Sequence, residues 1–126
     1  MTASARASAG ARQALGQYGE RLAERHLRAQ GMVVLDRNWR CREGEIDLVL
    51  RDGDVLVACE VKTRSGLACG TPHEAVDDTK LERLQRLVLL WAQTHEVAPP
   101  ELRVDVVAVL RPLRGPSTLE HVVGVG

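Results

Sequence analysis

The stretch GEIDLVLRDGDVLVACEVKTR, residues 44 to 64, decides the fold because it has the pattern of two paired strands. Its two mostly apolar runs, residues 45 to 51 and 55 to 63, are rich in Val and Leu, and β-branched residues favour strands. Between the runs lies Asp52-Gly53, a dipeptide typical of tight hairpin turns. The stretch therefore predicts a β-hairpin inside a sheet.

Three charged residues interrupt this apolar pattern: Asp47 in the first arm, and Glu60 and Lys62 in the second. Because successive side chains of a strand point to opposite faces, Glu60 and Lys62 share one face with Leu56 and Ala58. That face begins apolar and becomes charged, whereas a simply solvated face would be polar throughout. The continuous apolar run before Glu60 also indicates a strand that is covered on both faces.

A carboxylate on such a strand needs a partner, since an unpaired buried charge is very unfavourable. Two carboxylates that converge across a hairpin are suitable oxygen ligands for Mg²⁺ or Mn²⁺, and an adjacent lysine could contact a phosphate. The alternative is a structural ion pair between Lys62 and Glu60 or Asp47 on a half-exposed strand. The spacing of these three residues by itself favours neither interpretation.

On the N-terminal side of the hairpin, apolar residues from about 11 to 30 recur with a helical period. Gly31 is well placed to end that helix. Gly16 and Gly19 weaken a helix, so we expect them to let another part of the molecule approach closely. The β-branched content of residues 32 to 39 predicts a strand that leads into the hairpin.

On the C-terminal side, a loop at residues 65 to 72 precedes a second helix that extends to about His95. Residues 71 to 74, Thr-Pro-His-Glu, have the form of a capping box with proline at the first helical position. Asp77-Asp78 could break this helix near its start. Its expected buried stripe consists of Leu81, Leu84, Val88, Trp91 and Ala92.

Two further strands complete the chain, an apolar one at residues 102 to 110 and an edge strand at residues 119 to 125. Asp105 lies within the apolar strand, so we expect it to pair with a basic residue; a metal-binding role is the less favoured alternative. The resulting order, α-β-β-β-α-β-β, predicts an α/β fold with a mixed sheet and flanking helices.

The length of 126 residues suits one domain. We assign residues 12 to 126 to that domain and residues 1 to 11 to a disordered tail. Aromatic residues make up 2% and the formal net charge is zero, which argues against a surface of stacked aromatics and against tight non-specific DNA binding. Any contact with nucleic acid would therefore need a local basic patch.

No run of residues is long and apolar enough to predict a membrane span or a secretory signal, so we expect no membrane partner. The three cysteines, Cys41, Cys59 and Cys69, form no Cys-x-x-Cys pair, and an odd number indicates reduced thiols in a cytoplasmic protein. A zinc site that uses Cys69 and His73 is a minor alternative, because further ligands are missing.

Four stretches together resemble a known bacterial family: GQYGERLAERHLRAQG (16 to 31), NWRCREGEIDLVL (38 to 50), VACEVKTRSG (57 to 66) and KLERL (80 to 84). They are similar to the YraN-type, UPF-class family of the PD-(D/E)XK superfamily, whose members have a restriction-endonuclease-like fold and include archaeal Holliday-junction resolvases. The resemblance covers about residues 14 to 110. Ile46 replaces the proline that often precedes the first carboxylate in the superfamily.

This resemblance implies a core of helix, three-strand meander, crossover helix and further strand, and it implies roles for individual residues. Asp47 and Glu60 would bind Mg²⁺ or Mn²⁺, Lys62 would be the catalytic lysine, and Glu20 would be a helix acid that adds to the metal site. The implied activity is a metal-dependent endonuclease acting on DNA, including branched DNA, and a junction resolvase would have to be a homodimer. The alternative is a non-catalytic module that binds nucleic acid or protein and retains the fold.

Basic residues near these motifs are candidates for contacts with nucleic acid. Arg40 and Arg42 precede the hairpin, Arg64 follows it, and Lys80 lies on the second helix. Phosphate contacts come mainly from such side chains, although solvated surface arginines are equally common near turns. Both tryptophans are expected in the core.

Overall fold

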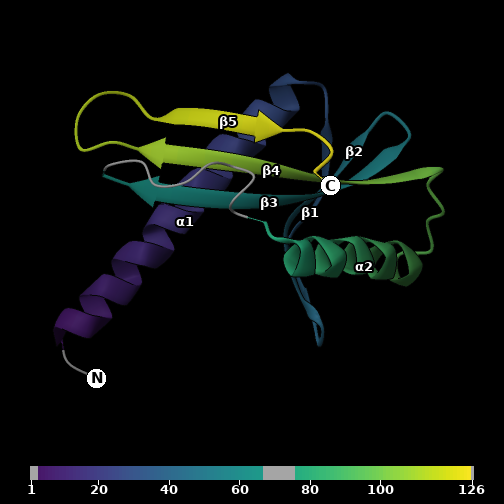
Figure 1. The fold of residues 1–126 in the computed structure, drawn as a ribbon, viewed down its shortest axis with the longest axis horizontal. Coiled ribbons are helices and arrows are strands. Elements are labelled where there is room, and N and C mark those ends of the chain that lie inside the picture. The colour runs from purple at the N-terminus through teal and green to yellow at the C-terminus, as the bar shows by residue number, and fades with distance from the viewer. Residues whose placement is uncertain (1–2, 67–75, 126) are drawn as a thin grey trace.

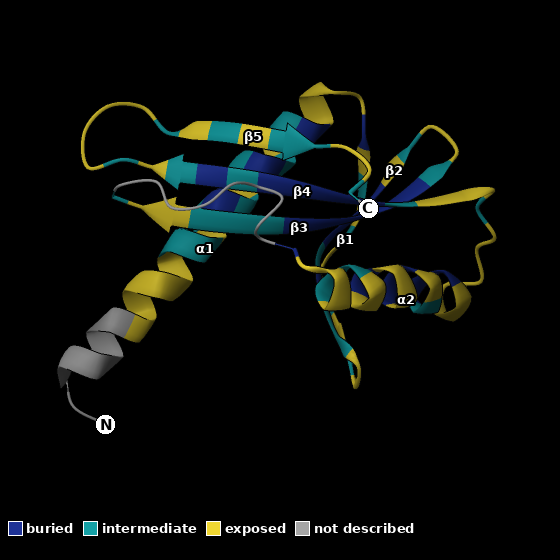
Figure 2. Ribbon diagram, viewed as in Figure 1, coloured by how far each residue is buried: buried dark blue, intermediate teal, exposed yellow. Residues whose placement is uncertain are grey.

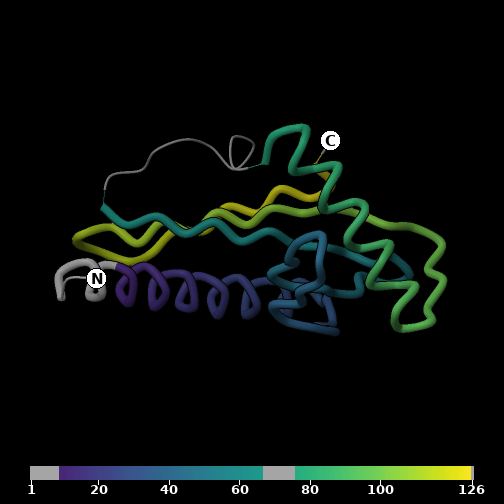
Figure 3. Tube along the Cα trace, turned by 90° about the horizontal axis from the view of Figure 1, so that it is seen from below, coloured from purple at the N-terminus to yellow at the C-terminus, as the bar shows by residue number. Residues whose placement is uncertain are grey.

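Two helices lie on opposite faces of a five-stranded sheet in the computed structural model, which describes residues 3–66 and 76–125 (Figures 1 and 3). The elements are α1 (Ala3–Ala29), β1 (Val33–Cys41), β2 (Gly44–Asp52), β3 (Val55–Ser65), α2 (Asp78–Thr94), β4 (Glu101–Arg111) and β5 (Thr118–Val122). Their order confirms the predicted α/β succession. None of the helices in the described ranges has both the length and the apolar character that a membrane span requires.

The sheet has the spatial order β1-β2-β3-β4-β5 and is mixed, as predicted. Strands β3 and β4 are parallel, and all other neighbours are antiparallel. Parallel neighbours need a crossover connection, and α2 lies in that connection. The result is an antiparallel meander at one side of the sheet and a parallel pair in its middle.

The core consists of two apolar clusters, one on each face of the sheet. Leu56 and Ala58 pack under α2, whereas Val57 and Cys59 pack under α1, so β3 is covered on both faces and the two central strands are largely buried (Figure 2). Strict alternation would put Ile46 beside Leu48 under α1, but Ile46 belongs to the cluster under α2. The ladder between β2 and β3 ends at Leu48, and beyond that residue β2 remains paired with β1 alone.

The helix ends follow local chemistry that the sequence partly indicated. Gly31, at φ 93°, ends α1, and its N–H donates to the Arg28 carbonyl at 2.9 Å, as in a glycine-terminated helix. Asp77 caps α2, and its carboxylate accepts the Lys80 N–H at 2.8 Å. The suspected break at Asp77-Asp78 is therefore a helix start. The expected capping box at residues 71 to 74 lies outside the described residues, as do Cys69 and His73.

The N-terminal helix differs from the prediction in its length. It begins at Ala3, although we expected a tail up to residue 11, so no change in secondary structure marks that boundary. The division of the chain into a tail and one domain stays a prediction.

Gly19 confirms the close approach that its place in a helix suggested. A Cβ at Gly19 would lie 1.8 Å from Thr63 Oγ1 of β3, whereas a Cβ at Gly16 would have no neighbour within 4 Å. Gly19 thus brings α1 against β3 within three residues of Glu60.

Candidate functional site

The candidate site forms where the ladder between β2 and β3 ends. The last paired residues at this end are Leu48 and Cys59. Beyond them, the Asp47 carboxylate accepts the Val61 N–H through Oδ2 at 2.8 Å. A side chain thus replaces a backbone partner in the ladder, and this hydrogen bond fixes the position of the carboxylate.

Asp47 and Glu60 line one cavity of about 210 Å³ between the sheet and α2. Glu45 adds a third carboxylate from β2, and Lys80 and Arg83 add positive charges from α2. The structure therefore brings together the two acids that the hairpin pattern singled out. It also places Lys80 and Arg83 at this cavity, whereas the helical pattern did not decide which way these two side chains face.

Lys80 forms an ion pair with Glu60, with Nζ 2.7 Å from Oε1. The Glu60 side chain is 12% exposed and the Lys80 side chain 32% exposed, so the pair is only partly screened by water. Lys80 thereby supplies the partner that a buried carboxylate needs. The sequence predicted Lys62 as the lysine beside Glu60, but the contact comes from a helix that begins 18 residues further along.

The cavity holds an excess of negative charge around Asp47. Burial and, next, the charge of Glu60 raise the pKa of Asp47, and the Val61 hydrogen bond opposes them; the net result is a pKa of about 7. Glu20 and Glu45 act in the same direction as Glu60. A cation in this cavity would relieve the repulsion and return Asp47 to its ionised form.

The donor set suits a hard cation such as Mg²⁺ or Mn²⁺ without forming a complete cage. Within residues 3–66 and 76–125, no group of three or more His, Cys, Asp or Glu side chains is close enough to hold a metal ion. Mg²⁺ is commonly held by one or two carboxylates, with water and substrate phosphate as its other ligands. Asp47 and Glu60 meet that smaller requirement.

Glu20, the helix acid that the family resemblance implied, lies on the α1 side, in a groove rather than in the cavity of Asp47. Burial raises its pKa, and the charges of Glu45 and Glu60 add to this shift. In the amide orientation that satisfies its hydrogen bonds, Asn38 donates to Glu20 Oε1 at 3.3 Å and to Glu45 Oε1 at 3.2 Å. Asn38 thus connects the groove to the carboxylates, and a role of Glu20 as a metal ligand stays a prediction.

Asn38 is a residue that our interpretation of the sequence missed. It has a φ of 48°, and asparagine tolerates this left-handed conformation better than most residues. An asparagine is also unfavourable inside a strand. Its presence at residue 38 of a predicted strand was the available signal.

Lys62 is half-buried on β3, two residues beyond Glu60. It pairs in register with Ala108 of β4. No acid of the described ranges forms an ion pair with it, whereas Glu60 is already paired. The structural interpretation, in which Lys62 neutralises Glu60 or Asp47, is therefore wrong for the described residues, and the catalytic role stays a prediction.

Of the four basic residues proposed from the sequence, two lie at or beside the cavity and two do not. Lys80 lines the cavity, and Arg40 contacts Glu45, another lining residue, at 3.4 Å between Nε and Oε1. Arg42 and Arg64 are exposed, and neither lines one of the cavities described here. Their contact with nucleic acid stays a prediction.

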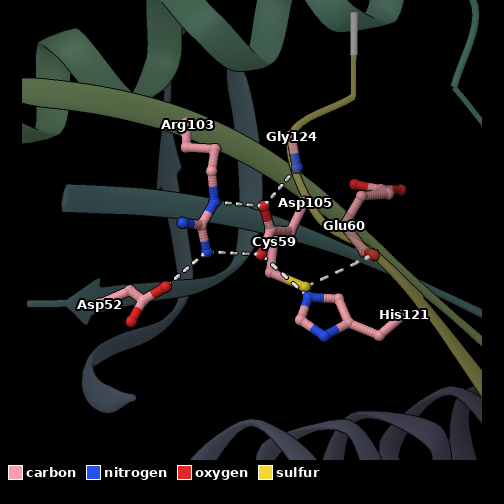
Figure 4. Close-up of polar contacts among 7 residues, drawn as sticks. All are labelled: Asp52, Cys59, Glu60, Arg103, Asp105, His121 and Gly124. Atoms are coloured by element: carbon pink, nitrogen blue, oxygen red, sulfur yellow. Dashed lines mark hydrogen bonds and ion pairs between the residues drawn. The ribbon is translucent and has the colours of Figure 1, made fainter. Parts of the chain in front are cut away.

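Asp105 is buried away from the cavity and is paired, as expected (Figure 4). It accepts hydrogen bonds from Arg103 Nε at 2.8 Å and from the Gly124 N–H at 3.0 Å, and His121 Nε2 lies 2.9 Å from its Oδ2. Arg103 also reaches Asp52 at 3.0 Å. This cluster fastens β5 and the chain after it to the centre of the sheet.

Both tryptophans lie in the core, as predicted. Trp91 is 4% exposed and Trp39 packs against the same cluster. The Trp91 indole N–H donates to Asp36 of β1 at 2.9 Å, which ties α2 to the edge of the sheet.

Comparison with known proteins places the chain in a family. The model of the uncharacterised protein family UPF0102 matches residues 19–109. A UPF0102 protein of a Nocardioides species is 62% identical over the full length of both chains. A UPF0102 protein of Kineococcus radiotolerans is 60% identical over 91% of this chain and 95% of its own. The expected UPF class is thereby confirmed: the chain belongs to the family UPF0102.

Proposed function

We propose that this chain is a metal-dependent endonuclease of the restriction-endonuclease-like superfamily that hydrolyses DNA phosphodiesters. The observation that carries the proposal is the convergence of Asp47 and Glu60 on one cavity at the end of the β2–β3 ladder. The raised pKa of Asp47 supports it, because an excess of buried negative charge is a common property of cation sites. The order of helix, meander, crossover helix and strand supports the superfamily placement.

In this proposal Asp47 and Glu60 hold Mg²⁺ or Mn²⁺. When bound, the ion supplies a Lewis acid that stabilises the charge developing on the phosphate. The Val61 N–H keeps the Asp47 carboxylate in place. Lys80 orients Glu60 before the ion binds. Lys62, which is free of acidic partners in the described ranges, donates to a phosphate oxygen.

The test is cleavage of linear, flapped and four-way DNAs with Mg²⁺ or Mn²⁺ by the wild type, Asp47→Ala and Lys62→Ala. Each substitution should lower the cleavage rate by a factor of about 100 or more, as is usual for groups that act on the reacting atoms. Arg114→Ala is the matched control, because Arg114 is exposed and lies outside the cavity. Cleavage that survives both substitutions would contradict the assignment of the site.

A non-catalytic module is the second candidate, and the Glu60–Lys80 ion pair is the observation that favours it. A carboxylate that already has an internal cation can be purely structural. Titration with Mn²⁺ in the absence of DNA separates the two functions. Failure to bind Mn²⁺ together with failure to cut any of the DNAs would favour the module. Preferential cutting of four-way DNA would in turn require a homodimer, which sedimentation measures directly.

A further inference from the structure

A second concave surface lies on the α1 side of the sheet, away from the cavity of Asp47. This groove has a volume of about 500 Å³ and is lined by residues of α1, β1 and β2. Its charged lining consists of four arginines and two glutamates: Arg21, Arg25, Arg28, Arg37, Glu20 and Glu24. The chain as a whole is neutral, so this groove is a local concentration of positive charge.

The two acids of the groove do not cancel its arginines. Glu24 accepts hydrogen bonds from Arg37, with Nη2 2.9 Å from Oε2, and it lies 3.2 Å from Arg28 Nε. Arg21 and Arg25 are exposed, and neither forms an ion pair with another residue of the described ranges. Two guanidinium groups therefore remain available for an anionic partner.

The arginines of α1 have a spacing that suits a chain of phosphates. Arg21, Arg25 and Arg28 follow each other at four and three residues, which places them on one side of a helix. With a rise of about 1.5 Å per residue, the row is roughly 10 Å long. Neighbouring phosphates of one DNA strand lie farther apart than their rise of about 3.4 Å along the duplex axis, so the row can contact about two of them. Guanidinium forks also match phosphate oxygens in two-point contacts.

The groove is connected to the candidate site through Asn38. Asn38 lines the groove, and its amide donates both to Glu20 in the groove and to Glu45 in the cavity. A backbone lying along α1 would thus end beside the carboxylates. An acidic protein segment would pair with the arginines of the groove equally well. It would not explain why Asn38 joins the groove to the carboxylates of the cavity.

We propose that the α1 groove binds the phosphate backbone of a DNA strand and that Arg21 and Arg25 make its principal contacts. The purpose of this binding, to present the strand to Asp47 and Glu60, rests on the proposed nuclease function. The binding itself does not, because it needs neither metal nor cleavage. It can therefore be measured separately.

The experiment measures fluorescence anisotropy of a fluorescein-labelled 20-base-pair duplex in EDTA over a series of KCl concentrations. The slope of log K against log salt is negative, and each lost phosphate contact reduces its magnitude by about 0.9. The double variant Arg21→Ala/Arg25→Ala should therefore lose about two units of slope and bind at least tenfold more weakly. Arg21→Lys/Arg25→Lys should retain most of the slope. The matched control, Arg51→Ala/Arg114→Ala, removes the same charge from two exposed residues outside the groove and should leave the slope unchanged.

Each outcome bears on one of the two proposals. Equal slopes for the wild type and the Arg21→Ala/Arg25→Ala variant would contradict the proposal that the groove binds DNA. Equal losses in the groove variant and the control would also overturn it, because only net charge would then matter. Binding of a polyglutamate peptide that depends on Arg21 and Arg25, without binding of the duplex, would assign the groove to an acidic protein instead. Salt-dependent binding through the groove without any cleavage would support this inference while contradicting the nuclease.

Discussion

At the scale of single residues, Asp47 is held between opposing effects. Burial and the neighbouring carboxylates favour its protonated form, and one hydrogen bond from the Val61 N–H favours its charged form. The first effects prevail, since the pKa is raised to about 7. Without a cation, the ionised form of Asp47 therefore destabilises the folded protein at neutral pH.

We predict that Asp47→Asn stabilises the metal-free protein, and increasingly so as the pH rises. The folded-state pKa of about 7 exceeds the reference value of 3.8, so the wild type loses stability between about pH 4 and pH 7. Asparagine keeps an acceptor for the Val61 N–H but carries no charge. One pKa unit corresponds to about 1.4 kcal/mol, and because neighbouring acids share the shift, we expect a gain of about 2 kcal/mol at pH 8. Urea unfolding in EDTA at pH 4.5 and pH 8 measures it, and a difference independent of pH would contradict the prediction.

The residues of the site differ in how far the sequence could predict them. Asp47 and Glu60 were identifiable because a charge inside an apolar strand is a local anomaly. Lys80 was one of four basic candidates, since its contact with Glu60 depends on how α2 crosses β3. The role of Asn38 could not be predicted from the sequence, because it depends on the left-handed backbone conformation at this residue. Contacts between distant segments leave no periodic signal in the chain, so they emerge only from the folded structure.

At the scale of elements, the contact between α1 and β3 places the helix against the site. The absent side chain of Gly19 lets Thr63 approach it, because a Cβ there would lie 1.8 Å from Thr63 Oγ1 and 2.9 Å from Thr63 Cβ. Alanine would normally strengthen a helix relative to glycine. Sterics and helix propensity therefore oppose each other at this residue.

Gly19→Ala should destabilise the protein by about 2 kcal/mol, since overpacking in a well-packed contact usually does so by about 1–3 kcal/mol. Gly16→Ala is the control in the same helix, where an added Cβ meets nothing within 4 Å, and it should be neutral or stabilising by up to about 1 kcal/mol. Thr63→Ala should partly restore the stability of Gly19→Ala. Midpoints of urea unfolding compare the variants, and equal midpoints for the two glycine variants would show that α1 moves away from β3 at no cost.

The elements themselves were largely predictable, because each has a clear period or a clear end. The hairpin, both helices and the last two strands fall near the expected residues. The start of α1 was misjudged, since small residues before residue 11 carry no amphipathic pattern and alanine favours helices. Ile46 departs from strict alternation at the point where β2 is paired with β1 but no longer with β3.

At the scale of the whole molecule, the sheet separates two concave surfaces, one beside each helix. The α2 side carries the carboxylate cavity, and the α1 side carries the arginine groove. The Asp105 cluster lies at a third place and joins the C-terminal segment to the sheet (Figure 4). Its hydrogen bonds from Arg103, His121 and Gly124 supply the partners that the buried Asp105 carboxylate needs.

We predict that Asp105→Asn weakens the attachment of β5 and destabilises the protein by about 3 kcal/mol, because removing one partner of a buried charged cluster leaves the others unpaired. Burial raises the pKa of Asp105, but hydrogen bonds from Arg103, Gly124 and His121 outweigh it and hold the pKa below its usual value. The stabilisation is therefore present above about pH 4 and lost as the pH falls below the reference pKa. Hydrogen exchange should become faster in residues 118–125, and urea unfolding at pH 7 should give the loss of stability. Glu120→Gln, on the exposed side of the same strand, is the control and should change neither. Unchanged exchange in β5 of Asp105→Asn would mean that its backbone ladder with β4 alone holds the strand.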